Sequence, residues 1–199
     1  MLDLNLNSLS GTVPSELALL QDLTLLDLGK NFLSGTVPSE YGSFELLEEL
    51  VLQINLLTGT VPTELAGLGA LKELAIAGNE FTGTIPSELG LLANLVGLEL
   101  TNNFLEGPIP TELGKLRLLT DLELDLNRIT GTVPTELGQL VSLLRLRLEL
   151  TLLTGVVPAE VCNALTLVTD FVTDCAGDPP EVECSCCTSC SEVEPEVPV

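Results

Sequence analysis

The residue types in this sequence that could do chemistry are its cysteines and its carboxylates. All six cysteines lie in the last quarter of the chain, and they are Cys162, Cys175, Cys184, Cys186, Cys187 and Cys190. Their even number favours disulfides and therefore an extracellular protein, either secreted or at the cell surface, although the sequence does not choose among the possible pairings. An alternative is a structural zinc site in which the last four of these cysteines act as thiolate ligands.

Composition excludes several classes of function. The chain has no histidine, so Ser-His-Asp and Cys-His catalysis and imidazole-ligated metal sites are impossible. It has 29 acidic and 7 basic residues, a net charge of −22, which disfavours nucleic acids and anionic membranes as partners because phosphate contacts need clustered Lys and Arg. Basic proteins, cationic ligands and divalent cations fit this charge better. An apolar run long enough to span a bilayer, about 18 residues, is also missing from the sequence.

One pattern repeats along most of the chain with a fixed period of two dozen positions. Its prolines are Pro14, Pro38, Pro62, Pro86, Pro110, Pro134 and Pro158, and its asparagines are Asn7, Asn31, Asn55, Asn79, Asn103 and Asn127, with Thr151 in the seventh unit. A fixed period of this length is typical of a solenoid, in which each unit buries its apolar residues against the next.

Each unit predicts the same local structure. A Leu-x-Leu pair, such as Leu98 and Leu100, indicates a short strand with one buried face, and stacked units pair these strands into a parallel sheet. The asparagine that follows is expected to bond backbone groups of the neighbouring turn. The Gly-x-Val/Ile-Pro segment predicts a tight turn and a second extended piece, and Ser/Thr-Glu-Leu begins a short helix or 3-10 turn.

These units resemble a known family. The segment at residues 98–116, Leu-Glu-Leu-Thr-Asn-Asn-Phe-Leu-Glu-Gly-Pro-Ile-Pro-Thr-Glu-Leu-Gly-Lys-Leu, resembles the plant-type extracellular leucine-rich repeat of receptor-kinase ectodomains and polygalacturonase-inhibitor proteins. The Thr-Gly-Thr-Val-Pro-Thr-Glu-Leu variant and the cysteine-rich segment are most similar to secreted or receptor-like repeat proteins of diatoms. The resemblance implies an α/β leucine-rich-repeat solenoid, a right-handed β-α superhelix of seven repeats with a parallel concave sheet, and an extracellular recognition role.

The sequence divides into three parts. Residues 1–168 are predicted to form the solenoid, with its first repeat truncated; residues 169–190 form a cysteine-rich cap, which Cys162 is placed to tie to the body; and residues 191–199 form an acidic, proline-containing tail. Met1 is followed directly by Leu-Asp-Leu-Asn-Leu, which lacks the features of a signal peptide. We therefore expect a longer protein, with a secretion signal, a membrane anchor or further repeats missing from this sequence.

The residues that flank each strand leucine form columns on the outside of the sheet, and charges gather there in the last repeats. The predicted ligand-binding residues are Glu99, Thr101, Asp121, Glu123, Asp125, Arg145, Arg147 and Glu149. Lateral ion pairs of Arg145 with Asp121 and of Arg147 with Glu123 are a purely structural interpretation of the same pattern. Asp125 beside Glu149 offers oxygen ligands for calcium, which is a further alternative, although we predict no metal site.

A second surface carries hydroxyl groups at the Ser/Thr-Gly-Thr segments. Its central members are Thr36, Thr58, Thr60, Thr82, Thr84, Thr130 and Thr132. This two-column array resembles the faces of ice-binding solenoids, but Glu106 and Pro108 interrupt it. Small β-branched residues also simply suit an exposed strand.

Catalysis is not expected. Glu99 beside Glu123 could mimic the carboxylate pair of a retaining glycosidase, but an open sheet lacks a water-excluding cleft. The sequence therefore predicts a non-enzymatic extracellular recognition module, without a cofactor, that binds a protein, peptide or glycan on its concave sheet, for example as the ligand-sensing part of a receptor. The alternatives are an ice-binding protein and a calcium-dependent adhesion or cell-wall structural protein.

Overall fold

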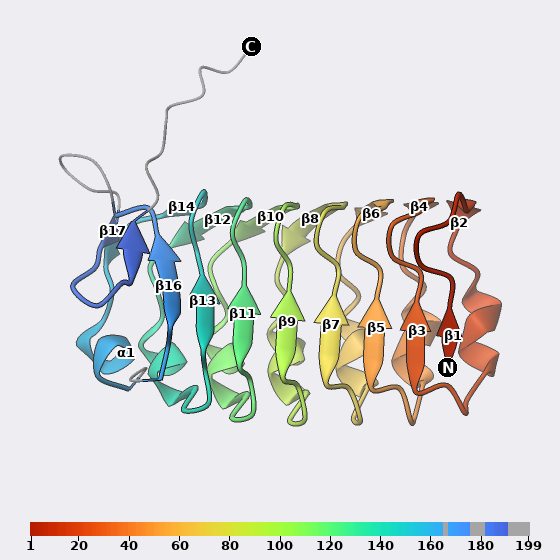
Figure 1. Ribbon diagram of the computed structural model, residues 1–199, viewed down its shortest axis with the longest axis horizontal. Coiled ribbons are helices and arrows are strands. Elements are labelled where there is room, and N and C mark those ends of the chain that lie inside the picture. The colour runs from red at the N-terminus through yellow and green to blue at the C-terminus, as the bar shows by residue number, and fades with distance from the viewer. Residues whose placement is uncertain (165–166, 176–181, 191–199) are drawn as a thin grey trace, which may run out of the picture.

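The computed structural model describes residues 1–164, 167–175 and 182–190, and these form one elongated stack of coils (Figure 1). Each coil passes through a strand of a first sheet, a strand of a second sheet and a helical turn. The predicted solenoid is confirmed, with about seven coils that follow the period of the sequence. The predicted acidic tail at residues 191–199 lies outside the described residues.

The first sheet has nine parallel strands and faces the viewer in Figure 1. Its strands, in order, are β1 (Leu2–Asp3), β3 (Leu25–Asp27), β5 (Glu49–Val51), β7 (Glu73–Ala75), β9 (Gly97–Glu99), β11 (Asp121–Glu123), β13 (Arg145–Arg147), β16 (Asp170–Thr173) and β18 (Ser189–Cys190). From β1 to β13 every residue pairs with the residue one full period later, so that Leu74 lies beside Leu98 and Leu98 beside Leu122. These leucines are fully buried, which fixes the register because a slip of one residue would expose them.

The second sheet has seven parallel strands and is staggered relative to the first. Its strands, in chain order, are β2 (Ser10–Thr12), β4 (Phe32–Gly35), β6 (Leu56–Gly59), β8 (Glu80–Thr84), β10 (Phe104–Gly107), β12 (Arg128–Gly131) and β14 (Leu152–Leu153). Here Phe104 pairs with Thr82 and not with Glu80, which holds the equivalent position in the preceding coil. The strands therefore shift by two residues per coil. A short pair of β15 (Gly155–Val156) and β17 (Val182–Glu183) lies beyond it.

A helical turn follows the proline of each coil. The first six are 3-10 turns, and the seventh is the α-helix α1 (Ala159–Ala164); the six turns are η1 (Ser15–Leu19), η2 (Ser39–Ser43), η3 (Thr63–Gly67), η4 (Ser87–Leu91), η5 (Thr111–Lys115) and η6 (Thr135–Gln139). Glycines let successive turns approach closely, since a Cβ atom at Gly90 or Gly114 would overlap the backbone carbonyl of the next turn. The short helical element predicted for each unit is thus a single tight turn in most coils.

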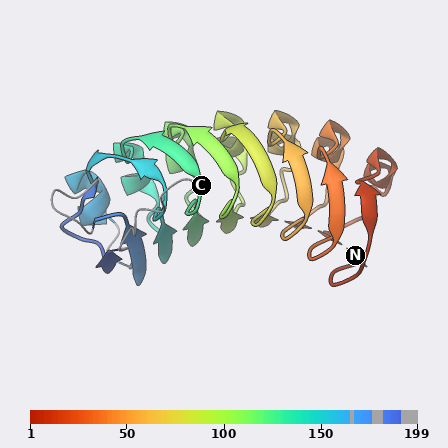
Figure 2. The same ribbon diagram turned by 90° about the horizontal axis from the view of Figure 1, so that it is seen from above.

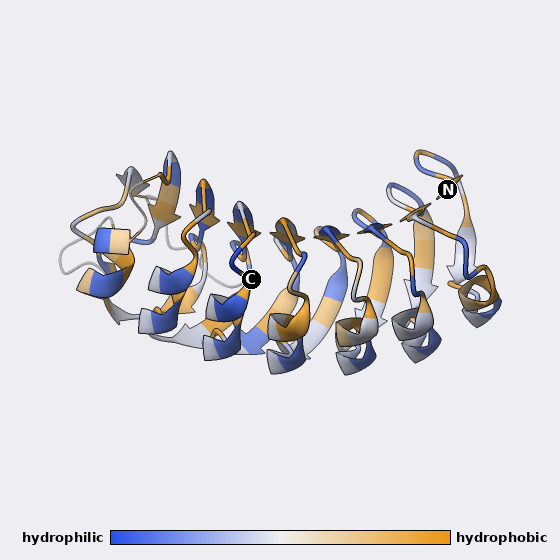
Figure 3. Cartoon of the chain, turned by 90° about the horizontal axis from the view of Figure 1, so that it is seen from below, coloured by the Kyte–Doolittle hydropathy of each residue, from blue (hydrophilic) through white to orange (hydrophobic). Residues whose placement is uncertain are grey.

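The stack is a shallow arch. Figures 2 and 3 both show the helical turns along its outer side, and Figure 3 shows hydrophilic residues on these turns. The nine-stranded sheet is the concave sheet that the sequence predicts. Between the two sheets and the turns runs one continuous apolar core, filled mainly by leucine.

The asparagine column closes the bend between the two sheets. Asn31, Asn55, Asn79, Asn103 and Asn127 are only 5% to 7% exposed. In Asn103, for example, Nδ2 donates to the carbonyls of Leu100 (3.1 Å) in its own coil and Ile76 (3.2 Å) in the preceding coil, and Oδ1 accepts from the backbone N–H of Phe81 (3.0 Å). Each amide therefore satisfies backbone groups that the bend would otherwise leave unpaired, as the sequence predicts.

The cysteine-rich segment lies at the end of the stack and adds strands to it. β16 pairs with β13, and β17 pairs with β15. Asp174 is 1% exposed, and its carboxylate accepts from the backbone N–H groups of Leu150 (2.7 Å) and Thr151 (3.0 Å). In the coils before, a backbone carbonyl of the following coil accepts these bonds, as when Leu150 accepts from Asn127, so Asp174 replaces those carbonyls at the end of the ladder.

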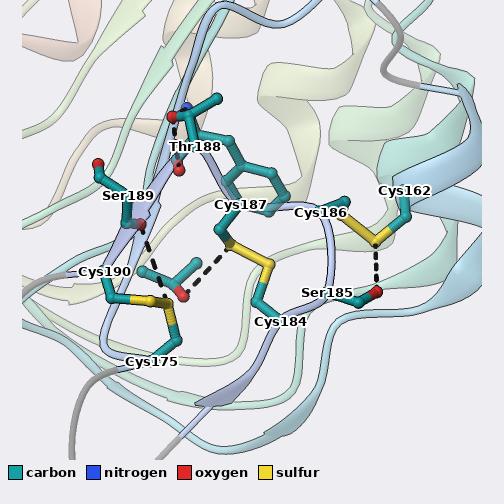
Figure 4. The surroundings of a disulfide bond; sticks show 11 residues. Cys162, Cys175, Cys184, Ser185, Cys186, Cys187, Thr188, Ser189 and Cys190 are labelled. Carbon is teal, nitrogen blue, oxygen red and sulfur yellow. Dashed lines mark hydrogen bonds between the residues drawn. A yellow bond between two sulfur atoms is a disulfide. The ribbon is translucent and has the colours of Figure 1, made fainter.

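All six cysteines form disulfides, which confirms that prediction (Figure 4). The pairs are Cys162–Cys186, Cys175–Cys190 and Cys184–Cys187. Cys162 belongs to α1, so its disulfide links the seventh coil to the residues after β17. The disulfides leave no thiolate for the alternative zinc site.

Replacement of Asn103 by alanine is expected to lower the free energy of unfolding by about 3 kcal/mol, because several buried backbone groups lose their partner at once. The measurement is urea unfolding followed by circular dichroism. Asn94→Ala is the matched control: Asn94 is exposed and donates one bond, to Gly69 (2.8 Å), so its loss should cost about 0.5 kcal/mol or less. Equal effects of the two substitutions would contradict the structural role of the column.

The disulfides should differ in their contribution to stability because they close loops of different length. Cys162–Cys186 spans 24 residues and Cys184–Cys187 spans 3. Replacing both cysteines of the longer loop by serine should lower stability by about 3 kcal/mol, and replacing both of the shorter loop by less than about 2 kcal/mol. Thermal melts under oxidising conditions test this order, and the reverse order would show that loop closure does not govern it.

Candidate ligand-binding surface

The outward residues of the nine-stranded sheet form the surface that the sequence predicts as the binding site, and we call it the front face. From β5 to β13 it consists of Glu49, Val51, Glu73, Ala75, Gly97, Glu99, Asp121, Glu123, Arg145 and Arg147, with Thr101, Asp125 and Glu149 just after the strands. Because the strands pair in register, these residues stand in columns. The structure therefore brings the predicted residues together on neighbouring strands.

The arginines of β13 neutralise the C-terminal end of the front face. Arg145 Nη1 lies 2.7 Å from Asp121 Oδ1 and 3.1 Å from Glu123 Oε1, so the predicted pair of Arg145 with Asp121 is confirmed. The pair predicted between Arg147 and Glu123 is wrong. Arg147 instead contacts Asp170 (3.2 Å) on β16 and Glu149 (3.8 Å), because β16 offers a carboxylate on its other side.

Asp125 supports the face from below. It is 4% exposed, and its Oδ1 accepts from the hydroxyl of Thr101 at 2.7 Å. Glu149, on the next coil, is largely buried, and its Oε2 has no hydrogen-bond partner among the described residues. Burial is the main cause that raises the pKa of Glu149, and the charge of Asp125 adds to it. The described residues contain no group of three potential ligands placed to hold a metal ion.

The middle of the front face has small residues surrounded by acids. Ala75 is 3% exposed and Gly97 is buried, and a Cβ atom at Gly97 would overlap the carboxylate of Glu73. The side chain of Glu73 therefore lies across the position that Gly97 leaves open. In the described residues neither Glu73 nor Glu99 forms an ion pair.

Crowding of carboxylates changes the proton affinity of this region. Burial raises the pKa of Glu73 to about 7, and the neighbouring charges of Glu99, Asp121, Glu49 and Glu123 add to the shift. The pKa of Glu99 is also raised, first by burial and then by Glu123 and Asp121, while Arg145 opposes the shift. The centre of the front face is thus a concentration of negative charge in which no described residue forms an ion pair with Glu73 or Glu99, and part of that charge develops only near neutral pH.

The hydroxyl surface lies on the second sheet. Its seven threonines are exposed or half-buried, in line with the expected alternation. The methyl group of Thr60 lies against Gly83, where a Cβ atom would approach to 3.0 Å, and Gly83 has a positive φ of 76°. Glu106 and Pro108 are exposed in the fifth coil and interrupt the array, as the sequence indicates.

Two shallow hollows lie between this second sheet and the outer turns. One of about 510 Å³ is lined by residues that include Thr84, Pro86 and Glu88, and one of about 560 Å³ by residues that include Thr132, Pro134 and Val156. They adjoin at Pro108. Every helical segment among the described residues is too short or too polar to cross a bilayer.

Comparison with a family model and with solved structures identifies the fold. The family model described as Leucine Rich Repeat matches residues 70–92 and 94–116. The plant peptide hormone receptor RGFR1, solved in complex with RGF2, is 33% identical with a TM-score of 0.83, and the match covers 90% of this chain and 28% of that one. The fold is a leucine-rich-repeat solenoid.

Further solved structures share this leucine-rich-repeat fold. The Arabidopsis receptor kinase HAESA, solved with the peptide hormone IDA and the co-receptor SERK1, is 37% identical with a TM-score of 0.77, and the match covers 79% of this chain and 26% of that one. A leucine-rich-repeat protein of Leptospira interrogans is 38% identical with a TM-score of 0.72, covering 84% of this chain and 41% of that one. No curated protein sequence matches the chain. This solenoid spans about a quarter of the length of RGFR1 and HAESA, the two plant receptors compared.

The residues predicted as ligand-binding begin at Glu99 and so leave out Glu73, which lies nearer the N-terminal end of the front face. Charges are most numerous from Glu99 onward, but Arg145 pairs there with Asp121 and Glu123, and Arg147 pairs with Asp170. Glu73 stands in the same column as Gly97 and Asp121. The signal that could have found it is the glycine itself, because a missing side chain in a column lets the neighbouring carboxylate lean over and become partly buried.

Replacement of Glu73 by glutamine is expected to stabilise the solenoid by an amount that grows as the pH rises from about 4.5 to about 7. Folded Glu73 keeps its proton up to about pH 7, whereas its ordinary pKa is 4.5, so ionisation opposes folding as the pH rises through this window. We expect Glu73→Gln to gain about 1 kcal/mol over wild type at pH 8 and little near pH 4, the gain being reduced by partial exposure. Thermal melts across this range measure it.

The control for this pH series is Glu45→Gln, which removes one charge at an exposed position after the turn η2. A gain that is the same at pH 4 and pH 8 would contradict the link to ionisation of Glu73.

Proposed function

We propose that this leucine-rich-repeat solenoid is a non-catalytic extracellular recognition module that binds a basic segment of a protein or peptide on its front face. The observation that carries the proposal is the negative charge of Glu49, Glu73 and Glu99, which form no ion pair with any described residue, around the small residues Ala75 and Gly97. Lysine or arginine side chains of a ligand would supply the counterions that the described part of the chain does not place there.

The proposed contacts extend along the sheet. Glu73 and Glu49 join the predicted residues Glu99, Thr101, Asp121, Glu123, Arg145, Arg147 and Glu149. Asp125 acts through Thr101, whose hydroxyl it holds. The arginines add positive charge at one end of the face, so a ligand would approach with its basic residues toward β7 and β9 and with an acidic or polar part toward β13. This polarity would set the direction in which the ligand lies across the strands.

The comparisons support this choice of ligand class. Two solved structures similar to this chain are the plant peptide hormone receptor RGFR1 in complex with RGF2 and the receptor kinase HAESA in complex with the peptide hormone IDA and the co-receptor SERK1. The three disulfides fit an oxidising, extracellular environment. The comparisons do not favour the ice-binding or calcium-dependent alternatives, and the more specific resemblance to diatom proteins, like the glycan ligand, stays a prediction.

The test is a selection of random peptides displayed on phage against the immobilised protein at pH 7.5. Selected peptides should be enriched in Lys and Arg, and Glu73→Arg with Glu99→Arg should weaken their binding by roughly 30-fold or more, since like charges then face each other. Binding should also strengthen from pH 6 to pH 8 as Glu73 ionises. Fluorescence anisotropy with labelled peptides measures both effects.

The matched control is Glu88→Arg with Glu112→Arg, which changes the net charge equally but lies on the outer turns η4 and η5. Peptides that bind both double variants as well as wild type would place the binding surface elsewhere. Equal weakening by the two double variants would show attraction by net charge alone.

A further inference from the structure

The bend between the two sheets carries an exposed apolar ridge that the proposed function does not use. Two columns form it, one just before the buried asparagine and one just after. The first column is Leu6, Lys30, Ile54, Gly78, Asn102, Leu126 and Leu150, and the second is Ser8, Phe32, Leu56, Glu80, Phe104, Arg128 and Leu152. Together they follow the upper edge of the stack in Figure 1, where the two sheets join.

Eight of these fourteen positions hold large apolar side chains, which are 41% to 73% exposed. With about 150 Å² available per side chain, they expose roughly 600 Å² of apolar surface. Soluble monomers rarely expose contiguous apolar patches beyond a few hundred Å². The six of these side chains that lie in coils three to seven expose about 420 Å², roughly half of the ~800 Å² that each partner buries in a standard interface.

The backbone conformation of the ridge is a second, independent observation, and it indicates that the fold does not require these apolar side chains. Leu6, Ile54, Leu126 and Leu150 have φ between 53° and 56°, a left-handed conformation that disfavours branched side chains. Gly78 occupies the same position in the fourth coil at φ 65°. Glycine or asparagine at these positions would reduce the backbone strain and would expose no apolar side chain. Folding therefore does not account for the apolar residues.

The charges of the ridge identify its partner. In a chain of net charge −22 the ridge carries only Lys30, Arg128 and Glu80. Arg128 lies 5.0 Å from the ring centroid of Phe104, and among the described residues neither Arg128 nor Glu80 forms an ion pair. Glu80 belongs to the fourth coil, Phe104 to the fifth and Arg128 to the sixth, so the opposite charges stand symmetrically about Phe104.

We propose that two copies of this chain associate through this ridge, flank to flank and antiparallel, with a two-fold axis that passes beside Phe104. Coils three to seven of each ridge then face the same coils of the second copy in reverse order. Glu80 of each copy pairs with Arg128 of the other, which gives two ion pairs. Phe104 lies opposite Phe104 of the second copy, and the large Leu126 lies opposite Gly78. Ile54 and Leu56 of the third coil pack against Leu150 and Leu152 of the seventh. A closed, self-complementary contact of this kind is the usual form of a homodimer.

Other registers lose this match. A shift by one coil places Glu80 opposite Phe104 or Leu152, and a shift by two places Glu80 or Arg128 opposite itself. A parallel arrangement about an axis along the ridge brings each coil against the same coil of the second copy, so Glu80 meets Gly78 and Arg128 meets Leu126. The chosen axis also passes beside β9, the fifth of the nine strands in the first sheet, so the two arches overlap along their whole length.

The dimer has a consequence for recognition. A rotation about the viewing direction of Figure 1 leaves the front face toward the viewer, so both front faces point the same way and lie side by side. This inference does not depend on the ligand of the front face, because the ridge and the front face share no residue. Each can fail without the other.

Sedimentation velocity of the full chain, from low micromolar concentration upward in about 150 mM salt, tests the dimer by charge reversal. Wild type is expected to dimerise. Glu80→Arg and Arg128→Glu should each weaken association by roughly 30-fold or more, because two like-charge contacts replace two ion pairs. The double variant Glu80→Arg with Arg128→Glu should recover the dimer, since the pairs reform with reversed sign.

Net charge cannot produce this outcome, because Glu80→Arg makes the chain less negative and so reduces repulsion between copies. Glu88→Arg, in the same coil but on the outer turn η4, is the matched control and should stay dimeric. Melting curves establish that each variant is folded. A monomeric wild type, a dimer that persists in Glu80→Arg, or a double variant that stays monomeric would overturn the proposal.

A cysteine on the two-fold axis tests the register separately. Phe104→Cys should form an intermolecular disulfide under mild oxidation, because the residue faces its own counterpart. Val141→Cys, exposed at the turn after η6 on another side of the coil, should not. Equal cross-linking of both variants would contradict the proposed axis.

Discussion

The structure depends on the hydrogen bonds that each asparagine side chain makes where the chain bends from one sheet to the next. A bend exposes backbone groups that no strand can pair, and in a solenoid this bend recurs inside the molecule in every coil. Asn79 shows the solution: its amide donates to the carbonyls of Leu52 and Ile76, both at 3.0 Å, and accepts from Leu57 N–H at 3.1 Å. Because these bonds cross between coils, they hold neighbouring coils in one register.

This register brings residues of successive repeats together on the front face and so determines its electrostatics. Once coils stack without slippage, residues one period apart stand side by side, and a variable position becomes a column. Within such a column Glu73 precedes Gly97, so the carboxylate can lean across the gap and lose part of its hydration. The raised pKa of Glu73 follows from this loss and from nearby carboxylates. The electrostatics of the front face are therefore a product of stacking and not of any single coil.

The sequence predicts the fold well because the same residue types recur at the same positions of every repeat. The strand leucines, the asparagine column, the turns after proline and the existence of disulfides all follow from residue type and period. Interactions that occur once could not be predicted in this way. The pairing of Cys184 with Cys187, the contact of Arg147 with Asp170 and the bond from Leu150 to Asp174 all involve residues that leave the period. Glu73 was not predicted for a related reason, since a count of charges does not show which acids the arginines neutralise.

The bend that the asparagine closes also determines which side chains are exposed on the apolar ridge. With the asparagine turned inward, the residues on either side of it must point outward, and the one before it takes a left-handed conformation in coil after coil. The fold needs only a small or flexible residue there, as Gly78 and Asn102 illustrate. Where Ile54 or Leu126 stands instead, folding gains nothing from the exposed side chain, so an apolar flank is compatible with the solenoid but not required by it. Association of two copies through this ridge would place their two front faces in one plane at a fixed separation. A ligand or ligand pair that reached both would then be held by two weak contacts acting together, because the second contact forms at high effective concentration.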